Sequence, residues 1–344
     1  MKEKTYNAVK TLALCACLTL LGYSEFFAQA KISTTAAQFL GISIGARELG
    51  MGGTSVASAF DVSSIYYNPG AFSQVHKTQV LVSTTDWLVG SKFRWLGAML
   101  DIDGSNAIGL SITQLAYGDE MVTTEDNPEG TGERWSAQDF ALALSYSRNL
   151  TDRFSIGGSA KYINQTIWNE TASTIAFDLG LLFVTGFHDM RLGMSIANFG
   201  GDMKMDGRDL RKVIDIDPSN AGSNKLNLAN MVTDPWPIPL IFRVGFAMDV
   251  VKNQTATVTL ECDAQRPSDN VEVINVGAEV TLMNLISLRG GYKSLFQKDS
   301  EEGLTLGAGV KYDQLGSMGL EINYAYQQFG KFGNLNTFSL GINF

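Results

Sequence analysis

Apolar and polar residues alternate one by one along most of the chain after residue 77. In the last segment, for example, Phe338, Leu340 and Ile342 are separated by small or polar residues. Successive side chains of a β-strand point to opposite faces of the sheet, so a period of two predicts strands with one apolar and one polar face. A soluble β-sandwich alternates in the same way, and the pattern alone does not separate the two folds.

The lengths of the alternating segments favour a membrane barrel. They run for about 10 to 14 residues, whereas globular strands usually have about 5 to 6 and tilted membrane strands about 9 to 11. The predicted fold class is all-β, a 14-stranded antiparallel transmembrane β-barrel, with the even strand number typical of bacterial outer-membrane barrels. We expect the strands at 78–88, 92–102, 105–118, 136–149, 153–168, 174–186, 190–199, 238–251, 255–263, 272–283, 285–294, 303–313, 317–328 and 335–344.

The connections between these strands are alternately short and long. Every second link is a tight turn, such as Asp103-Gly104 or Met283-Asn284, and most of the others are longer, up to the segment 200–237. Outer-membrane barrels have short turns on the periplasmic side and longer loops outside. The alternation supports the strand count, and the long loops 119–135 and 200–237 become the candidates for contact with a partner.

The polar face of the strands suits a barrel lumen, because the apolar face is rich in Leu, Phe and Tyr and suits lipid. Its charges are of both signs. These charges are expected either to hold a plug by salt bridges or to line a conduit. A selective pore would show rings of charges of one sign, so the mixed signs favour the salt bridges. The charged residues expected to face the lumen are Arg94, Lys161, Asp178, Arg243, Glu261, Glu279, Arg289, Lys311 and Glu321.

The two ends of the chain indicate export to the outer membrane. Residues 1–30 have a basic start, an apolar stretch and the small-residue site Ala28-Gln29-Ala30, which is the pattern of a secretory signal peptide. The last strand is amphipathic and ends on an aromatic residue, as signals for the outer-membrane assembly machinery do. The residues of this expected assembly signal are Phe338, Leu340, Ile342 and Phe344.

Composition and charge remove several function classes. The chain is acidic, with a formal net charge of −9 and no basic stripe, which argues against nucleic acid as a partner. The two histidines, His76 and His188, are both expected at the periplasmic rim, so neither is placed to activate a serine. Cys262 is the one cysteine after the signal, which excludes an internal disulfide. We therefore expect no enzyme and no cofactor.

Clustered carboxylates in the segment 200–237 leave one question open. A solvated acidic loop is the favoured interpretation because the spacing of an EF-hand is absent, and calcium binding is the alternative. The carboxylates concerned are Asp202, Asp206, Asp209, Asp215 and Asp217.

Residues 31–77 precede the barrel (78–344) and do not alternate cleanly. Their glycines are not followed by the Lys-Ser/Thr of a phosphate-binding loop. Glycine also allows main chain to approach main chain closely, so we expect a plug or hatch segment inside the barrel. Asp61 is expected to cap a short helix, and Asn68-Pro69 to turn the chain into the first strand. The plug residues singled out are Gly50, Gly52, Gly53, Asp61, Asn68 and Pro69.

Several short motifs resemble the PorV/PorQ family of outer-membrane proteins. They are Gly45-Ala46-Arg47, Leu49-Gly50-Met51-Gly52-Gly53, Asp61, Tyr67-Asn68-Pro69, Phe242-Arg243-Val244-Gly245, Val276-Gly277-Ala278-Glu279, Arg289-Gly290-Gly291-Tyr292-Lys293, Tyr324-Ala325-Tyr326 and Phe338-Ser339-Leu340-Gly341. The family groups with FadL-like barrels of fourteen strands with an N-terminal plug.

The resemblance implies one of two functions. PorV-like members belong to the type IX secretion system of Bacteroidetes-type bacteria, where they receive exported proteins by their C-terminal domains. FadL-like relatives move hydrophobic small molecules. The partners implied are outer-membrane lipid, the assembly machinery, and components and cargo of type IX secretion.

Overall fold

The computed structural model describes residues 34–58, 61–187, 189–217, 219–220, 226–297, 300–315 and 318–344, with the side chains of 314 and 315 left out. The expected signal peptide at 1–30 and His188 lie outside these residues. Among the described residues, no helix is long and apolar enough to cross a membrane.

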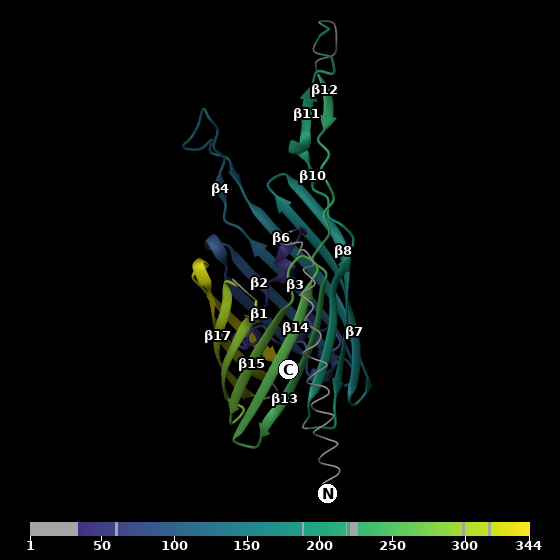
Figure 1. The fold of residues 1–344 in the computed structure, drawn as a ribbon, viewed down its shortest axis with the longest axis vertical. Coiled ribbons are helices and arrows are strands. Elements are labelled where there is room, and N and C mark those ends of the chain that lie inside the picture. The colour runs from purple at the N-terminus through teal and green to yellow at the C-terminus, as the bar shows by residue number, and fades with distance from the viewer. Residues whose placement is uncertain are drawn as a thin grey trace, which may run out of the picture. The chain divides into compact units, whose positions relative to one another are not determined.

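Fourteen long antiparallel strands close into a barrel (Figure 1), because β1 pairs with β2 on one side and with the last strand, β19, on the other. Each strand pairs with its neighbours along the chain. The strands are β1 (Gln79–Asp86), β2 (Lys92–Asp101), β3 (Asn106–Ala116), β6 (Ala137–Thr151), β7 (Phe154–Ile167), β8 (Glu170–Val184), β9 (Arg191–Gly200), β13 (Ile241–Lys252), β14 (Ala256–Pro267), β15 (Val273–Leu282), β16 (Ile286–Leu295), β17 (Glu302–Leu315), β18 (Met318–Phe329) and β19 (Asn334–Asn343).

The predicted fold class, number of strands and antiparallel order are confirmed. The largest differences in bounds, of four residues each, are at β14, which ends at Pro267 and not near 263, and at β8, which begins at Glu170 and not near 174. Residues 170–173 alternate weakly, yet they pair with the end of β7, where Ile167 is opposite Glu170. The link between these strands is therefore a two-residue turn at 168–169, and pairing with a neighbour extended a strand that the pattern had missed.

The two longest connections, 117–136 and 201–240, lie at the same end of the barrel as expected, although the two-residue turn 168–169 also lies at that end. We call the end with the turns 102–105, 152–153, 253–255 and 283–285 the short-turn end, and the opposite end the long-loop end. In outer-membrane barrels the short-turn end faces the periplasm and the long-loop end the outside. β1 starts and β19 finishes at the short-turn end.

Short elements build the long loops. One hairpin pairs β4 (Glu120–Met121) with β5 (Arg134–Trp135). In the segment 201–240, β10 (Asp206–Gly207) pairs with β8, η4 (Arg208–Leu210) follows, and β11 (Arg211–Ile214) pairs with β12 (Asn227–Asn230). The β11–β12 hairpin projects beyond the barrel at the top of Figure 1. The single-turn elements η3 (Leu88–Gly90) and η5 (Gly330–Phe332) complete two other loops.

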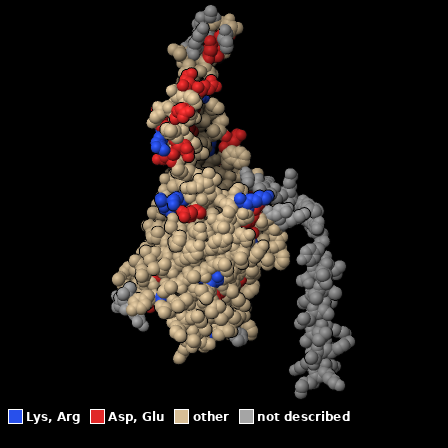
Figure 2. All heavy atoms as spheres, turned by 90° about the vertical axis from the view of Figure 1, so that its left-hand side faces the viewer, with Lys and Arg blue, Asp and Glu red and all other residues tan. Residues whose placement is uncertain are grey.

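The outer wall of the barrel is apolar. Large exposed side chains such as Leu144, Leu179 and Leu306 alternate with buried small or polar residues on the inner face. Figure 2 shows the consequence on one side of the molecule, where the wall is mostly uncharged and Asp, Glu, Lys and Arg gather on the loops above it. This distribution is that of a barrel in a lipid bilayer.

The segment 34–77 lies inside the barrel, and we call it the plug. It contains η1 (Gln38–Gly41), α2 (Ala46–Gly50), α3 (Ser64–Tyr67) and η2 (Phe72–Val75). Residues 37, 39, 40, 44–58 and 61–73 are buried. At the long-loop end the plug is held by Ala36, whose N–H donates to the carbonyl oxygen of Pro237 at 2.8 Å, and by Thr35, whose Oγ1 donates to Asp269 at 2.6 Å.

One half of the lumen is apolar. The plug places Phe39, Tyr66, Tyr67 and Phe72 against the inner faces of β1, β2, β3 and β6 to β8 in one buried cluster. The wall contributes mainly Phe93, Trp95 and Met99 together with small alanines. Burying each large side chain contributes about 1.5–3 kcal/mol, so this contact is a major part of what holds the plug.

The prediction that Arg94 faces the lumen is wrong, because this residue lies on the outer wall. Along β2 the buried residues are Phe93 and Trp95, while Lys92 and Arg94 are exposed. The usual polar-in arrangement is reversed here because the inner face of β2 packs against the plug. Trp95 lies over Gly97, the next inward residue, at a position where any Cβ would overlap the indole ring.

The opposite half of the wall contacts the plug backbone directly through glycines. Gly52 has φ +76, and a Cβ on it would lie 2.7 Å from the carbonyl oxygen of Val276. The wall needs glycine too, because a Cβ on Gly277 would overlap the carbonyl of Met51 and one on Gly291 would overlap the backbone N of Gly52. Gly50 and Gly307 form a third pair, with 2.9 Å from an added Cβ on Gly50 to the Cα of Gly307. The close approach expected from the glycine cluster thus takes place here.

Neighbouring glycines of β16 allow a matched test of this packing. We expect Gly291→Ala to destabilise the folded barrel by about 1–3 kcal/mol, because its methyl group meets plug main chain that has no free volume to move into. Gly290 faces the outside, where an added Cβ has its nearest neighbour, Leu306 Cδ2, at 4.0 Å, and Gly290→Ala should leave stability nearly unchanged. Urea midpoints from heat-modifiable migration in detergent gels measure both. Equal midpoints for the two variants would show that plug and wall are not in contact.

Candidate functional site

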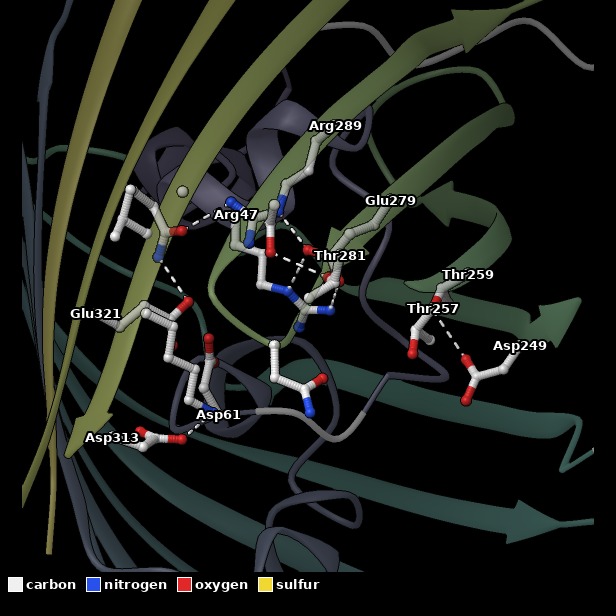
Figure 3. Close-up of a pocket in the computed structure, with 16 residues that line it drawn as sticks. Arg47, Asp61, Asp249, Thr257, Thr259, Glu279, Thr281, Arg289, Asp313 and Glu321 are labelled. Atoms are coloured by element: carbon white, nitrogen blue, oxygen red, sulfur yellow. Dashed lines mark hydrogen bonds and ion pairs between the residues drawn. The ribbon is translucent and has the colours of Figure 1, made fainter. Parts of the chain in front are cut away.

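A buried ion cluster joins the plug to the charged half of the wall (Figure 3). Arg47 of α2 donates from Nη2 to Glu279 Oε1 at 2.8 Å and from Nε to Oε2 at 3.0 Å. Arg289 of β16 binds the same carboxylate. The three side chains are 8% exposed or less. A bidentate guanidinium–carboxylate pair fixes orientation as well as distance, so Glu279 positions α2 against β15 and β16.

The cluster continues into neighbouring strands. Arg289 Nη1 donates to Asn323 Oδ1 at 2.7 Å, and Asn323 Nδ2 donates to Glu321 Oε1 at 2.9 Å. These residues line a cavity of about 320 Å³ near the short-turn end, together with Asp61, Lys311 and Asp313. Three cationic and five acidic side chains line it, so it is a polar cavity of mixed sign.

Two more of the predicted lumen charges form a separate pair in β7 and β8. Lys161 Nζ lies 2.6 Å from Asp178 Oδ2 and donates to Asn198 Oδ1 at 2.9 Å. Asp178 Oδ1 accepts the N–H of Asn198, which has φ 63 at the point where the register between β8 and β9 shifts. The pair therefore stabilises a β-bulge in the wall, a role that strand alternation does not reveal.

Arg243 and Glu261 also face the lumen and are buried. Their neighbour Asp263 makes the more informative contact, because its Oδ2 accepts the backbone N–H groups of Ser55 and Val56 at 2.8 and 3.0 Å. A carboxylate on the wall thus satisfies two donors of the plug that would otherwise be buried without partners.

The plug residues predicted from the sequence have specific contacts. Asp61 Oδ1 accepts the N–H of Ser63 at 2.8 Å, but Ser63 is itself the N-cap residue of the helix that begins at Ser64, so the expectation that Asp61 caps this helix is wrong. Asn68 donates from Nδ2 to the carbonyl oxygens of Val56 and Leu181, both at 2.8 Å. Pro69 packs against Gly157 of the wall. The chain then forms η2 before it enters β1.

The residues of the expected assembly signal lie on the lipid-facing side. Phe338, Leu340 and Phe344 are exposed, and Ile342 is half-buried on the same face.

Sequence reasoning missed Arg47 and Asp263 as contact residues. Arg47 stands within a signature motif next to the glycines, but its partner Glu279 is 232 positions away. Asp263 lies on the polar face of β14, and alternation alone does not distinguish it from the other charges of that face. Their roles depend on which wall strand lies beside which plug residue, and this is a tertiary property. Among the described residues no group of three or more His, Cys, Asp or Glu side chains is arranged to hold a metal ion.

A second candidate site is the segment 201–240, which we call the outer loop. It carries large apolar side chains in full contact with solvent, including Val232 at 83% and Ile216 at 72% exposed. Val213 and Leu228 are opposite each other in the β11–β12 ladder and share a face. Further exposed apolar residues of the loop are Ile214, Leu226, Met231 and Trp236.

A third feature is a cavity of about 370 Å³ at the long-loop end of the lumen. Its lining includes Phe39 of the plug with Trp87 and Leu115 of the wall, and also the polar Asp139 and Gln165. Its volume lies at the lower end of the range of about 300–1,000 Å³ that is usual for small-molecule pockets.

Comparison with protein families finds one match. The family model of the type IX secretion system protein PorV matches residues 26–265, which is more than half of the chain. No curated protein matches the sequence significantly.

Comparison with solved structures finds FadL-like barrels. The monoaromatic hydrocarbon channel CymD aligns with a TM-score of 0.55 at 11% identity, covering 88% of this chain and 96% of its own. A FadL homologue of Pseudomonas aeruginosa has a TM-score of 0.53 at 12% identity, with 88% and 98% covered. The toluene transporter TbuX of Ralstonia pickettii has 0.52 at 13%, with 88% and 97% covered. At these identities the likeness shows the fold.

The ion cluster generates a stability prediction. Arg47→Met leaves Glu279 with Arg289 as a partner, whereas Glu279→Met leaves two arginines side by side without their counter-ion. We expect both variants to lower the free energy of unfolding, Arg47→Met by about 3 kcal/mol and Glu279→Met by more. Unfolding midpoints in detergent measure the order.

Arg266→Met is the matched control for this prediction. Arg266 pairs with Glu272 at 3.1 Å, but both side chains are more than 60% exposed, and the loss should stay below about 1 kcal/mol. A larger effect of Arg47→Met than of Glu279→Met would contradict the assignment of Glu279 as the shared counter-ion.

Proposed function

We propose, because the chain belongs to the family of the type IX secretion system protein PorV, that this outer-membrane barrel binds exported proteins or partner components of that system at the cell surface. The outer loop is the contact site in this proposal. The plug and the ion cluster keep the barrel closed while the loop binds.

The observation that carries the proposal is the exposed apolar surface of the outer loop. Val213 and Leu228 extend from a two-stranded hairpin that has no third strand among the described residues. An isolated hairpin of this kind is marginally stable in water, and contiguous exposed apolar surface commonly marks an interaction site. A protein partner that covers this face would stabilise the hairpin and shield its apolar side chains from water.

The filled lumen supports a binding role over the passage of a polypeptide. The plug packs main chain to main chain against Gly277, Gly291 and Gly307, and its Arg47 is held by a buried carboxylate. A chain that crosses the barrel would have to displace all these contacts. Binding at the long-loop end leaves them in place.

A second function, transport of a hydrophobic small molecule, has its own supporting observation. The cavity lined by Phe39, Trp87 and Leu115 opens at the long-loop end beside the plug, in a barrel of the fold that hydrocarbon channels use. The charged cavity at the other end is polar, so an apolar path through the barrel requires movement of the plug.

A double substitution in the outer loop tests the first function. In cells that carry only the variant, we expect Val213→Ser with Leu228→Ser to trap type IX cargo in the periplasm. Binding of a purified cargo C-terminal domain should weaken at least roughly tenfold, as expected when two large apolar contacts are lost. Surface display and the dissociation constant are the measurements.

Met121→Ser in the β4–β5 hairpin is the control, because Met121 is 50% exposed on the other long loop. Normal display and binding in the Val213/Leu228 variant would refute the outer loop as the contact site. Normal display together with lost uptake of a hydrophobic compound in a strain that lacks the protein would favour the second function.

A further inference from the structure

Arg94 is a basic side chain on the lipid-facing wall. It is exposed on β2, and its partners in the ladder are Thr84 of β1 and Gln114 of β3. The next outward residue toward the short-turn end is Leu96, which is 41% exposed. The next outward residue toward the long-loop end is Lys92. Arg94 thus stands where the apolar band of the wall ends.

Arg94 has no partner within the part of the chain that the structure describes. None of its guanidinium nitrogens is hydrogen-bonded or within ion-pair distance of a carboxylate there. The other outward cations near the long-loop end differ in this respect, because Lys92 lies 2.8 Å from Asp86 and Arg266 lies 3.1 Å from Glu272. Arg94 alone of these three is left to find its counter-ion outside the protein.

The position of Arg94 limits what that counter-ion is. A charged side chain on the lipid face costs about 2–4 kcal/mol at the middle of the bilayer and close to none at its boundary, where it reaches headgroups and water. The guanidinium fork matches the geometry of a phosphate, to which it donates two parallel hydrogen bonds. Beside Arg94 the wall presents Leu96 and, across Thr84, Phe338, which are suited to acyl chains.

We propose that Arg94 is the phosphate-binding residue of a lipid site on the outer wall, and that its ligand is a phosphorylated lipid of the outer leaflet. The long-loop end faces outside in outer-membrane barrels, which places Arg94 at the headgroups of that leaflet. Lys92, two residues nearer the loops on the same face, is paired with Asp86, so the site depends on Arg94. The site rests on the outer-membrane location and is independent of the proposed binding of cargo.

Arg148 provides a matched control on the same wall. It is exposed on the outward face of β6, but it lies at the short-turn end, three residues before the strand ends at Thr151. Its substitution removes one positive charge from the lipid-facing wall, as the substitution of Arg94 does. It does not change the long-loop end, where the headgroups of the outer leaflet lie.

The test uses the full-length barrel reconstituted in phosphatidylcholine vesicles that contain diphosphorylated lipid A. The protein is extracted in mild detergent, and the lipid A that remains bound is quantified by mass spectrometry. We expect Arg94→Gln to reduce the retained lipid A roughly tenfold, as for the loss of one charge-assisted phosphate contact. Arg94→Lys should retain an intermediate amount, and Arg148→Gln the amount bound by the unmodified protein.

A second comparison needs no variant. The unmodified protein should retain diphosphorylated lipid A but not the same lipid after enzymatic removal of its phosphates. Equal retention of the two lipids would overturn the proposal, as would undiminished retention by Arg94→Gln. An equal loss of retained lipid A in Arg148→Gln would also overturn the proposal, because the lipid would then be attracted by the net charge of the protein and not by a specific site. Heat-modifiable migration confirms that each variant is folded.

Discussion

The structure depends on one steric constraint, the contact of plug main chain with wall main chain at glycine. Gly50, Gly52 and Met51 lie against Gly307, Gly291 and Gly277 with no space for a Cβ between them. So close a contact leaves no room for water, and plug donors must be satisfied by the wall. Thr305 Oγ1 accepts the N–H of Gly52 at 2.9 Å, and Ser339 Oγ accepts that of Ala46 at 2.7 Å. Steric fit and hydrogen-bond satisfaction therefore select the same arrangement.

This constraint divides the lumen into two halves with different chemistry. Where the plug presents aromatic side chains, the wall is apolar apart from the buried pair Lys161–Asp178, and it even reverses its usual polarity in β2. Where the plug presents backbone and Arg47, the wall presents Glu279, Arg289 and Asp263. Buried charges are tolerated only in pairs, so the plug and this half of the wall complete each other. The barrel without its plug would expose unpaired charges along one side and an apolar surface along the other.

The binding of cargo and the binding of a phosphorylated lipid, as proposed here, both take place on the outside of the barrel. The lumen is occupied by the plug, which is held there by Glu279 and Asp263 among the lumen charges. The outer loop offers apolar surface to a partner in solution, and the wall offers Arg94 to the membrane. A barrel that remains closed while its surface binds would fulfil the proposed role without passing protein through its own lumen.

The sequence by itself determined the barrel. Long segments of period two, an even strand count and alternating turn lengths specified fourteen antiparallel strands, because these features are local and each strand pairs with its neighbour in the chain. Glycines at 50 and 52 correctly indicated close backbone packing, whereas an added Cβ on Gly53 would meet only side-chain atoms of Ser43 and Lys293. Tertiary structure alone decided the rest. Arg94 lies on the lipid side because Phe93 and Trp95 are needed against the plug, and Glu279 binds Arg47 because the plug brings together residues 232 positions apart. Local alternation does not reveal which segment fills the lumen. That segment, the plug, determines where the side chains of Arg94 and Glu279 point.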